Sequence, residues 1–285
     1  MRSYAKELHK FEARHHYRDE VVKGRHFHYL LCGCGDQTLT LLVGGLGRSI
    51  LWFPYIRRLE KHYRILTFDY PFECGTNDEL IEAIHDLHEY LGIEKTVLVG
   101  SSIGGYFAQM YAMRYKENVQ AMCLFSTAAF SARTLEGLKG KYGKLREKAT
   151  LGLVRAVPYT LIKPVRILLL RRTWVGISDS ERAYMNGLLK EIYRNYTARE
   201  DIYMSRRFFD MLRQKPASRE DFLYLRGKIL LRLPEDDRTF SEEMQKDLVN
   251  MMPGCVLERV RGGHMATLMR PEEYADTIDY FLASM

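Results

Sequence analysis

The chain has 285 residues, of which 46% are hydrophobic and 28% are charged, and its net charge is +7. This length fits one large α/β domain or two smaller ones, and the composition is that of a soluble globular protein, which argues against a disordered chain. No run approaches the roughly 20 consecutive apolar residues that cross a bilayer. We therefore expect no stable membrane insertion.

Cysteine usage and the N-terminus indicate the compartment. The five cysteines are an odd number, and charged residues stand where a signal peptide needs an apolar core. We expect a cytoplasmic protein with reduced thiols. Cys32 and Cys34 form a C-x-C pattern without a second Cys or His pair at zinc-ligand spacing, so no metal is expected.

The positive charge is concentrated in one segment. Residues 131–220 carry 20 Lys or Arg against 9 Asp or Glu. The segment contains no recognisable nucleic-acid-binding module, so we expect no nucleic-acid partner and interpret these charges as a solvated face. Acidic substrates and an anionic membrane surface are the functional alternatives.

The first 126 residues alternate between strand-like and helix-like segments, a pattern typical of a mostly parallel sheet flanked by helices. Two short strands and a turn are expected before residue 37, after a polar, His-rich start. The following apolar runs predict strands at 39–43, 63–69, 96–99 and 119–125. The intervening helices are expected to end near 59 and to span about 78–91 and 105–115.

Residues 127–221 lack buried-strand runs and predict an inserted helical cap. Ser178 and Glu181 form a capping-box pattern at the start of one helix, and a second helix is expected over 201–212. The apolar, basic run at 161–172 is interpreted as cap core with arginines at its edges, in preference to a helix that skims a membrane.

The alternation resumes after the cap. Strands are expected at 228–233 and 255–260, and helices at about 241–251 and 271–282. Residues 1–126 and 222–285 are therefore assigned to one α/β core domain, and 127–221 to its inserted cap.

The central motif is Gly100-Ser101-Ser102-Ile103-Gly104, which matches the G-x-S-x-G pattern of a nucleophile elbow. A strand precedes it and a helix follows. The sharp turn would project the Ser102 hydroxyl from the sheet and present the Ile103 amide to a developing oxyanion. Ser102 is therefore the candidate nucleophile.

A serine nucleophile needs a base and an acid that orients the base. Of the nine histidines only His264 follows the elbow, on a glycine-rich loop after the last strand. Asp236 and Asp237 both follow a strand end, and neighbouring side chains point in different directions. We favour Asp237 as the acid, with Asp236 and then Glu235 as the alternatives.

Two other groups of residues have simpler interpretations. The cap acids are expected to be solvated on helix surfaces; they are Glu181, Asp210 and Asp221. Gly45-Leu46-Gly47 after a strand, with Asp69 ending the next strand, is similar to a dinucleotide fingerprint, but Ile50 occupies the third glycine position. We expect no cofactor, and assign the Leu46 amide to the oxyanion site instead.

Together these motifs resemble those of the α/β-hydrolase fold family, and in particular its capped, esterase-like enzymes. The resemblance implies Ser102 as nucleophile, Asp237 as orienting acid and His264 as base, with the Leu46 and Ile103 amides as the oxyanion hole. The chain departs from the family at Gly44, which stands where a histidine is usual.

The resulting prediction is a serine hydrolase that cleaves an ester, thioester or lactone of a largely apolar small molecule through an acyl-enzyme. The same fold also hosts carbon–carbon bond hydrolases and lyases, and it can serve as a ligand-binding receptor or an inactive scaffold. The sequence does not indicate an oligomeric state.

Overall fold

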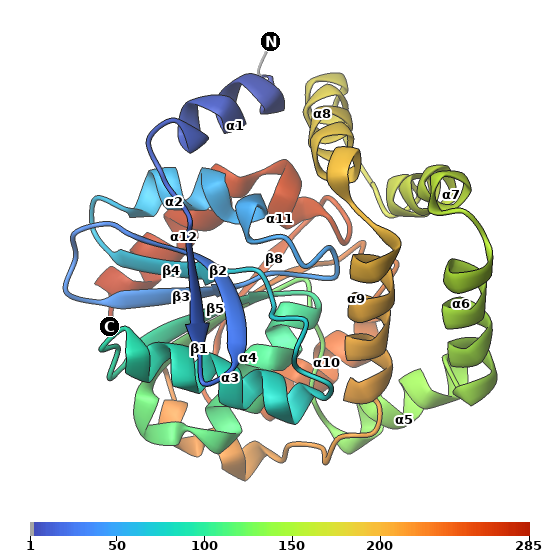
Figure 1. Ribbon diagram of the computed structural model, residues 1–285. Coiled ribbons are helices and arrows are strands. Elements are labelled where there is room, and N and C mark those ends of the chain that lie inside the picture. The colour runs from blue at the N-terminus through green and yellow to red at the C-terminus, as the bar shows by residue number, and fades with distance from the viewer. Residues whose placement is uncertain (1–2) are drawn as a thin grey trace.

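The computed structural model describes residues 3–285 and is drawn in Figure 1. Its centre is an eight-stranded sheet in the order β1-β2-β4-β3-β5-β6-β7-β8. β1–β2 and β2–β4 pair antiparallel, and the pairs from β4–β3 to β7–β8 are parallel. The predicted mostly parallel sheet is thus confirmed. The strands are β1 (Arg18–Val22), β2 (Arg25–Cys32), β3 (Thr38–Leu42), β4 (Arg64–Phe68), β5 (Thr96–Ser101), β6 (Val119–Phe125), β7 (Ile229–Pro234) and β8 (Val256–Val260).

The middle strands are buried on both faces because helices cover the sheet on each side. Every residue of β3 is buried, as is every residue of β5 before Ser101. Apolar residues therefore predominate in these strands, and the threonines among them are buried too: β3 is Thr-Leu-Thr-Leu-Leu and β5 begins Thr-Val-Leu-Val. The buried sheet gives its parallel strand ends a rigid edge on which loops can be fixed.

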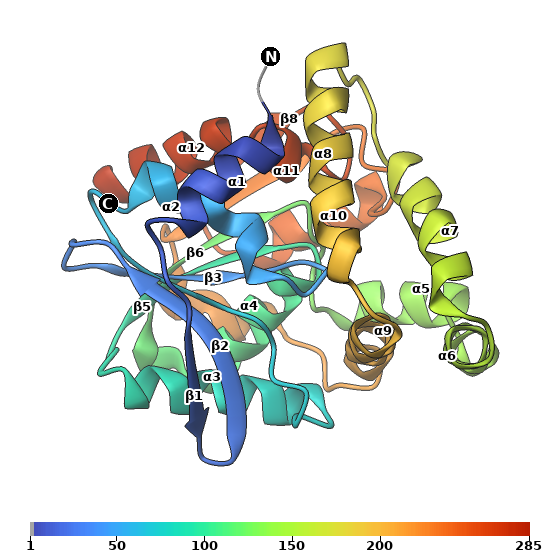
Figure 2. The same cartoon turned by 45° about the horizontal axis from the view of Figure 1, so that its top comes forward.

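Helices flank both faces. α2 and α12 pack together on one face, and α3 and α4 lie on the opposite face (Figures 1 and 2). The α-helices are α1 (Tyr4–Glu12), α2 (Phe53–Leu59), α3 (Asn77–Tyr90), α4 (Ile103–Arg114), α5 (Ala132–Lys141), α6 (Lys144–Ala156), α7 (Tyr159–Arg171), α8 (Asp179–Asn195), α9 (Ala198–Met211), α10 (Glu242–Met251), α11 (Ala266–Met269) and α12 (Pro271–Ala283). Short 3-10 helices are η1 (Ser49–Trp52), η2 (Lys116–Asn118) and η3 (Arg219–Leu225).

The N-terminal helix α1 was missed in the sequence, where only a polar stretch was expected. Tyr4, Leu8 and Phe11 form its buried face. The Tyr4 ring packs edge-on against Phe53 of α2 and Tyr184 of α8, with ring centroids 5.2 and 5.3 Å apart. α1 therefore links the sheet-covering helix α2 to the helical segment that follows β6.

The segment 127–221 is helical, as predicted, and α6, α7, α8 and α9 lie to one side of the sheet in both views (Figures 1 and 2). The expected capping box at the start of α8 is present, since Ser178 accepts from the Glu181 amide and the Glu181 side chain accepts from the Ser178 amide. α9 begins three residues earlier than expected, because Thr197 and Glu200 form a second capping box there.

The interpretation of 161–172 as cap core is correct only in part: Ile162 is buried and Ile167 and Leu170 pack against the core, but the other apolar residues are exposed. These residues fall almost entirely within α7, where Ile162 is the buried residue and Leu161 and Leu168 are 65% and 50% exposed. The apolar residues cover more than half of the circumference of this helix, so their spacing could not tell which side would meet the rest of the fold. Much of the apolar surface of α7 faces outward.

The expectation that the cap acids are simply solvated is also wrong. Glu181 accepts a 2.7 Å bond from Arg270, and its bonds to Ser178 and Arg270 lower its pKa against the opposing effect of burial. Asp210 accepts a 2.6 Å bond from the Asn77 amide, which lacks a partner within its own helix. Asp221 caps η3 through Ser218. Each of these three carboxylates therefore accepts a hydrogen bond from a backbone amide at the start of a helix.

Candidate active site

Ser102 lies at the turn from β5 to α4 in a conformation that non-glycine residues rarely adopt, with φ 55° and ψ −122°. Close packing around the turn requires glycine. A Cβ on Gly100 would lie 2.5 Å from the Gly104 carbonyl oxygen, and one on Gly104 would lie 2.1 Å from that of Leu42. The Ser102 amide donates to the Phe125 carbonyl at 3.0 Å, which ties the turn to β6.

His264 lies beside this serine. Its Nε2 is 3.0 Å from Ser102 Oγ, and its Nδ1 is 2.9 Å from Asp237 Oδ2. An ionised carboxylate can only accept, so the Nδ1 proton points to Asp237 and Nε2 is free to accept the serine proton. The Asp237 side chain is fully buried and that of His264 is 11% exposed. The structure therefore brings the three predicted residues into one hydrogen-bonded chain.

Asp236 points elsewhere. Its Oδ1 accepts from the Gly262 and Gly263 amides at 3.0 and 2.8 Å. It thereby holds the loop that carries His264, without touching the ring itself. Glu235, the third candidate acid, lies 3.9 Å from Arg261 at the surface. Sequence reasoning did not anticipate the role of Asp236, although a second acid at a strand end was the available signal.

The two residues whose amides are the candidate oxyanion donors, Leu46 and Ile103, both line the cavity beside Ser102. Within residues 3–285, neither the Leu46 nor the Ile103 amide donates to a carbonyl or side chain. A Cβ on Gly44 would lie 3.3 Å from the Ser101 carbonyl oxygen and 3.4 Å from Ser102 Cβ. The unusual Gly44 thus lets the loop after β3 approach the serine closely.

Asp69 has a structural partner of its own. Its Oδ1 accepts 2.8 Å and 2.6 Å bonds from the amide and hydroxyl of Ser49, just after the loop that carries Leu46. An aspartate that binds ribose would need to be free for that contact. Asp69 instead holds the end of the glycine loop through Ser49. It can do so because it directly follows β4. This role was not predicted from the sequence.

A cavity of about 520 Å³ adjoins Ser102 and His264. Most of its wall is apolar or aromatic and comes from both the sheet loops and the segment 127–221, for example Leu138, Met204 and Phe208. Two charged residues reach the wall, Arg166 and Asp201, and they pair with each other at 2.9 Å. The cavity therefore offers an apolar space with a neutralised ion pair.

Helices of the segment 127–221 contact the loops around the site. Trp174 makes an isolated antiparallel bridge with Gly263, next to His264. Met204 of α9 packs against Gly47, where an added Cβ would meet its sulfur at 2.8 Å, and Glu200 pairs with Arg48. These contacts place α9 against the loop after β3, and the connection between α7 and α8 against the loop that carries His264.

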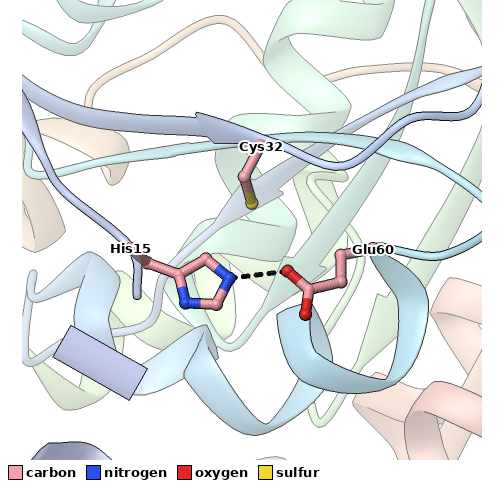
Figure 3. Close-up of side chains that lie close together, drawn as sticks. All are labelled: His15, Cys32 and Glu60. Atoms are coloured by element: carbon pink, nitrogen blue, oxygen red, sulfur yellow. Dashed lines mark hydrogen bonds and ion pairs between the residues drawn. The ribbon is translucent and has the colours of Figure 1, made fainter. Parts of the chain in front are cut away.

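One His/Cys/Glu group lies outside the site. His15, Cys32 and Glu60 offer ligand atoms within 4.8 Å of one another, the one such group in the described part of the chain (Figure 3). His15 Nε2 and Glu60 Oε2 are 2.6 Å apart, a hydrogen-bond distance, whereas two ligands of one tetrahedral Zn²⁺ lie about 3.3 Å apart. Burial raises the pKa of Cys32 to about 12, which keeps the thiol protonated. The His15–Glu60 pair fastens the segment after α1 to the end of α2.

Comparison with known proteins assigns the family. The model of the alpha/beta hydrolase fold family matches residues 37–270, so the chain belongs to that family. Within residues 3–285, no helix is both long and apolar enough to span a membrane.

Individual relatives are hydrolases of several kinds. The chain is 22% identical over 269 residues to the human monoacylglycerol lipase ABHD6, covering 87% of this chain and 76% of that protein. It is 30% identical over 122 residues to the proline iminopeptidase PfmaB of Pestalotiopsis fici, covering 38% of this chain and 42% of that one. The enol-lactonase structure from Burkholderia xenovorans superposes with a TM-score of 0.72 at 17% identity, covering 93% of this chain and 100% of the lactonase. The last comparison shows the fold alone.

Proposed function

We propose that the protein is a serine hydrolase that cleaves an ester, thioester or lactone through an acyl-enzyme. The observation that carries this proposal is the hydrogen-bonded chain from Ser102 through His264 to Asp237, with distances of 3.0 and 2.9 Å. The constellation matches the geometry in which a histidine activates a serine and a carboxylate holds the histidine tautomer.

In the proposed mechanism, Ser102 Oγ attacks the substrate carbonyl carbon while its proton passes to Nε2 of His264. Negative charge develops on the carbonyl oxygen and is stabilised by the free amides of Leu46 and Ile103. His264 then protonates the leaving alcohol or thiol, which departs with the electron pair of the broken bond. A water molecule, deprotonated by His264, attacks the acyl-enzyme and releases the acid and Ser102.

The cavity supports a largely apolar acyl or aromatic group as the substrate moiety, because apolar side chains form most of its wall. Arg166 does not favour an anionic substrate, since Asp201 already pairs with it. We propose that residues 127–221 act as the cap that forms the far wall of this cavity. The lipase and lactonase activities named for similar proteins are consistent with this substrate class.

We propose a cytoplasmic location from the five cysteines, which are all free in the structure.

Turnover of p-nitrophenyl esters of increasing acyl length tests the proposed function. The wild type should hydrolyse short to medium esters, and Ser102→Ala should lose at least about 10³-fold in kcat. Ser101→Ala is the matched control and should retain activity within about tenfold, since Ser101 contacts Thr267 and not His264. A folded wild type that turns over no ester of the series would favour the receptor or scaffold alternative instead.

A further inference from the structure

α7 turns an apolar stripe toward solvent. Leu161, Val165 and Leu168 are 65%, 54% and 50% exposed and do not line the cavity. They lie at i, i+4 and i+7, so they share one side of the helix. A surface helix normally turns such a stripe toward the core. A contiguous exposed apolar face of this kind marks an interaction site.

Exposed apolar side chains also lie on the preceding helix, α6. Leu145 and Leu153 are 83% and 57% exposed, and Figures 1 and 2 both place α6 and α7 at the periphery, away from the sheet. Residues 3–285 contain fourteen exposed large hydrophobic residues, and six of them lie on these two helices. The remaining eight are spread over the rest of the fold.

The charge around this stripe is strongly positive. Residues 144–172 contain eight Lys or Arg and one acidic residue, a net charge of +7 that equals the net charge of the entire chain. The single acid, Glu147, is already paired with Arg213. Within the described residues, Lys148, Arg155 and Arg172 make no ion pair, and all three are exposed. These cations remain available to an anionic partner.

We propose that α6 and α7 dock onto the surface of an anionic phospholipid membrane, with the α7 stripe at the level of the headgroups. One observation favours lipid over a protein partner. Apolar residues are combined with unpaired Lys and Arg, whereas the core of a protein interface is depleted of lysine. Anionic lipids of a cytoplasmic leaflet attract each such cation, and apolar side chains then enter the headgroup boundary.

The docked surface would adjoin the cavity. Arg166, Leu169 and Leu170 of α7 and Thr150 of α6 contribute to the wall of the cavity that contains Ser102. Docking would therefore place the bilayer next to the wall that encloses the candidate serine. The inference goes beyond the proposed function, since binding through this surface requires no turnover.

Vesicle co-sedimentation tests the proposal. The 285-residue chain carrying Ser102→Ala, so that no lipid is consumed, is mixed with vesicles of phosphatidylcholine alone or with about 30 mol% phosphatidylglycerol. The protein should bind the anionic vesicles at least tenfold more tightly than the neutral ones. Binding should weaken severalfold when salt rises from about 0.05 to about 0.5 M, because the Debye length shortens.

Variants locate the surface. Leu161→Ser with Leu168→Ser should weaken binding about tenfold or more, through lost apolar burial. Lys148→Gln with Arg172→Gln should weaken it by a similar factor, since each surface cation contributes about fivefold. Leu223→Ser with Leu257→Ser is the matched control, because these leucines are 45% and 38% exposed outside α6 and α7. It should bind as the parent protein does. Circular dichroism and Tm verify that each variant is folded.

Three results would overturn the proposal. The first is a folded parent protein that does not sediment with anionic vesicles at low salt. The second is unchanged binding in the α7 double variant. The third is a stable dimer that dissociates in that variant, which would mean that a second copy of the chain covers the stripe.

Discussion

Nδ1 of His264 donates a 2.9 Å hydrogen bond to Oδ2 of Asp237, and this contact determines which ring nitrogen faces Ser102. The adjacent Asp236 binds backbone amides of the histidine loop instead. Two neighbouring carboxylates therefore have different partners.

Asp237→Asn should reduce kcat by about 10⁴-fold, because an amide NH₂ group would donate to Nδ1 and shift the proton to Nε2, which could then no longer accept from Ser102. Asp236→Asn should cost less than about tenfold, since the asparagine oxygen can still accept from the Gly262 and Gly263 amides. Steady-state kinetics on one ester compares the two variants. A larger loss for Asp236→Asn would contradict our assignment of the acid.

Gly104→Ala should destabilise the protein, because its Cβ would lie 2.1 Å from the Leu42 carbonyl oxygen and would force β3 and the elbow apart. We expect a loss of several kcal/mol in the free energy of unfolding, about 3 or more. Gly152→Ala is the control: its Cβ would meet nothing within 4 Å, and alanine in a helix gains up to about 1 kcal/mol. Urea denaturation measures both. Equal stabilities would show that the elbow is not packed as described.

His88 should make the protein sensitive to acid. Burial lowers the pKa of His88 to about 3, and its two ring nitrogens bond Thr40 and Tyr111. The unfolded chain takes up this proton near pH 6.5, while the folded chain resists it, so stability present above pH 6.5 is lost as the pH falls toward 3.

Between pH 6.5 and 5, this group alone should remove about 1.5 kcal/mol from the free energy of unfolding. His88→Gln retains a polar side chain without this titration, so its stability should fall less over the same interval. Parallel urea titrations at the two pH values give the comparison. Identical pH dependence in both proteins would contradict a neutral, buried His88.

Much of the core could be predicted from the sequence because its signals are local. The Leu-rich run at 39–43 and the Val-Leu-Val of β5 are too apolar to lie at a surface, and the Ser178–Glu181 pair marks the start of α8 to the residue. Ser102 and His264 could be named because one needs a specific turn and the other is the single histidine downstream.

Other features depend on long-range packing. Asp236 and Asp237 are adjacent residues of the same type, and only the fold determines which of them points to His264. The α7 stripe faces outward because the rest of the segment packs elsewhere, which helical spacing does not encode. α1, by contrast, had a usable signal in the i, i+4, i+7 spacing of Tyr4, Leu8 and Phe11, but its many charged residues obscured it.

Covalent labelling by an active-site fluorophosphonate, followed by peptide mass spectrometry, is the most direct test of Ser102 as the nucleophile. We expect one modified residue, Ser102, with labelling lost in Ser102→Ala, retained in Ser101→Ala and strongly slowed in Asp237→Asn. Absence of labelling in folded wild type, or a label that persists in Ser102→Ala, would contradict it.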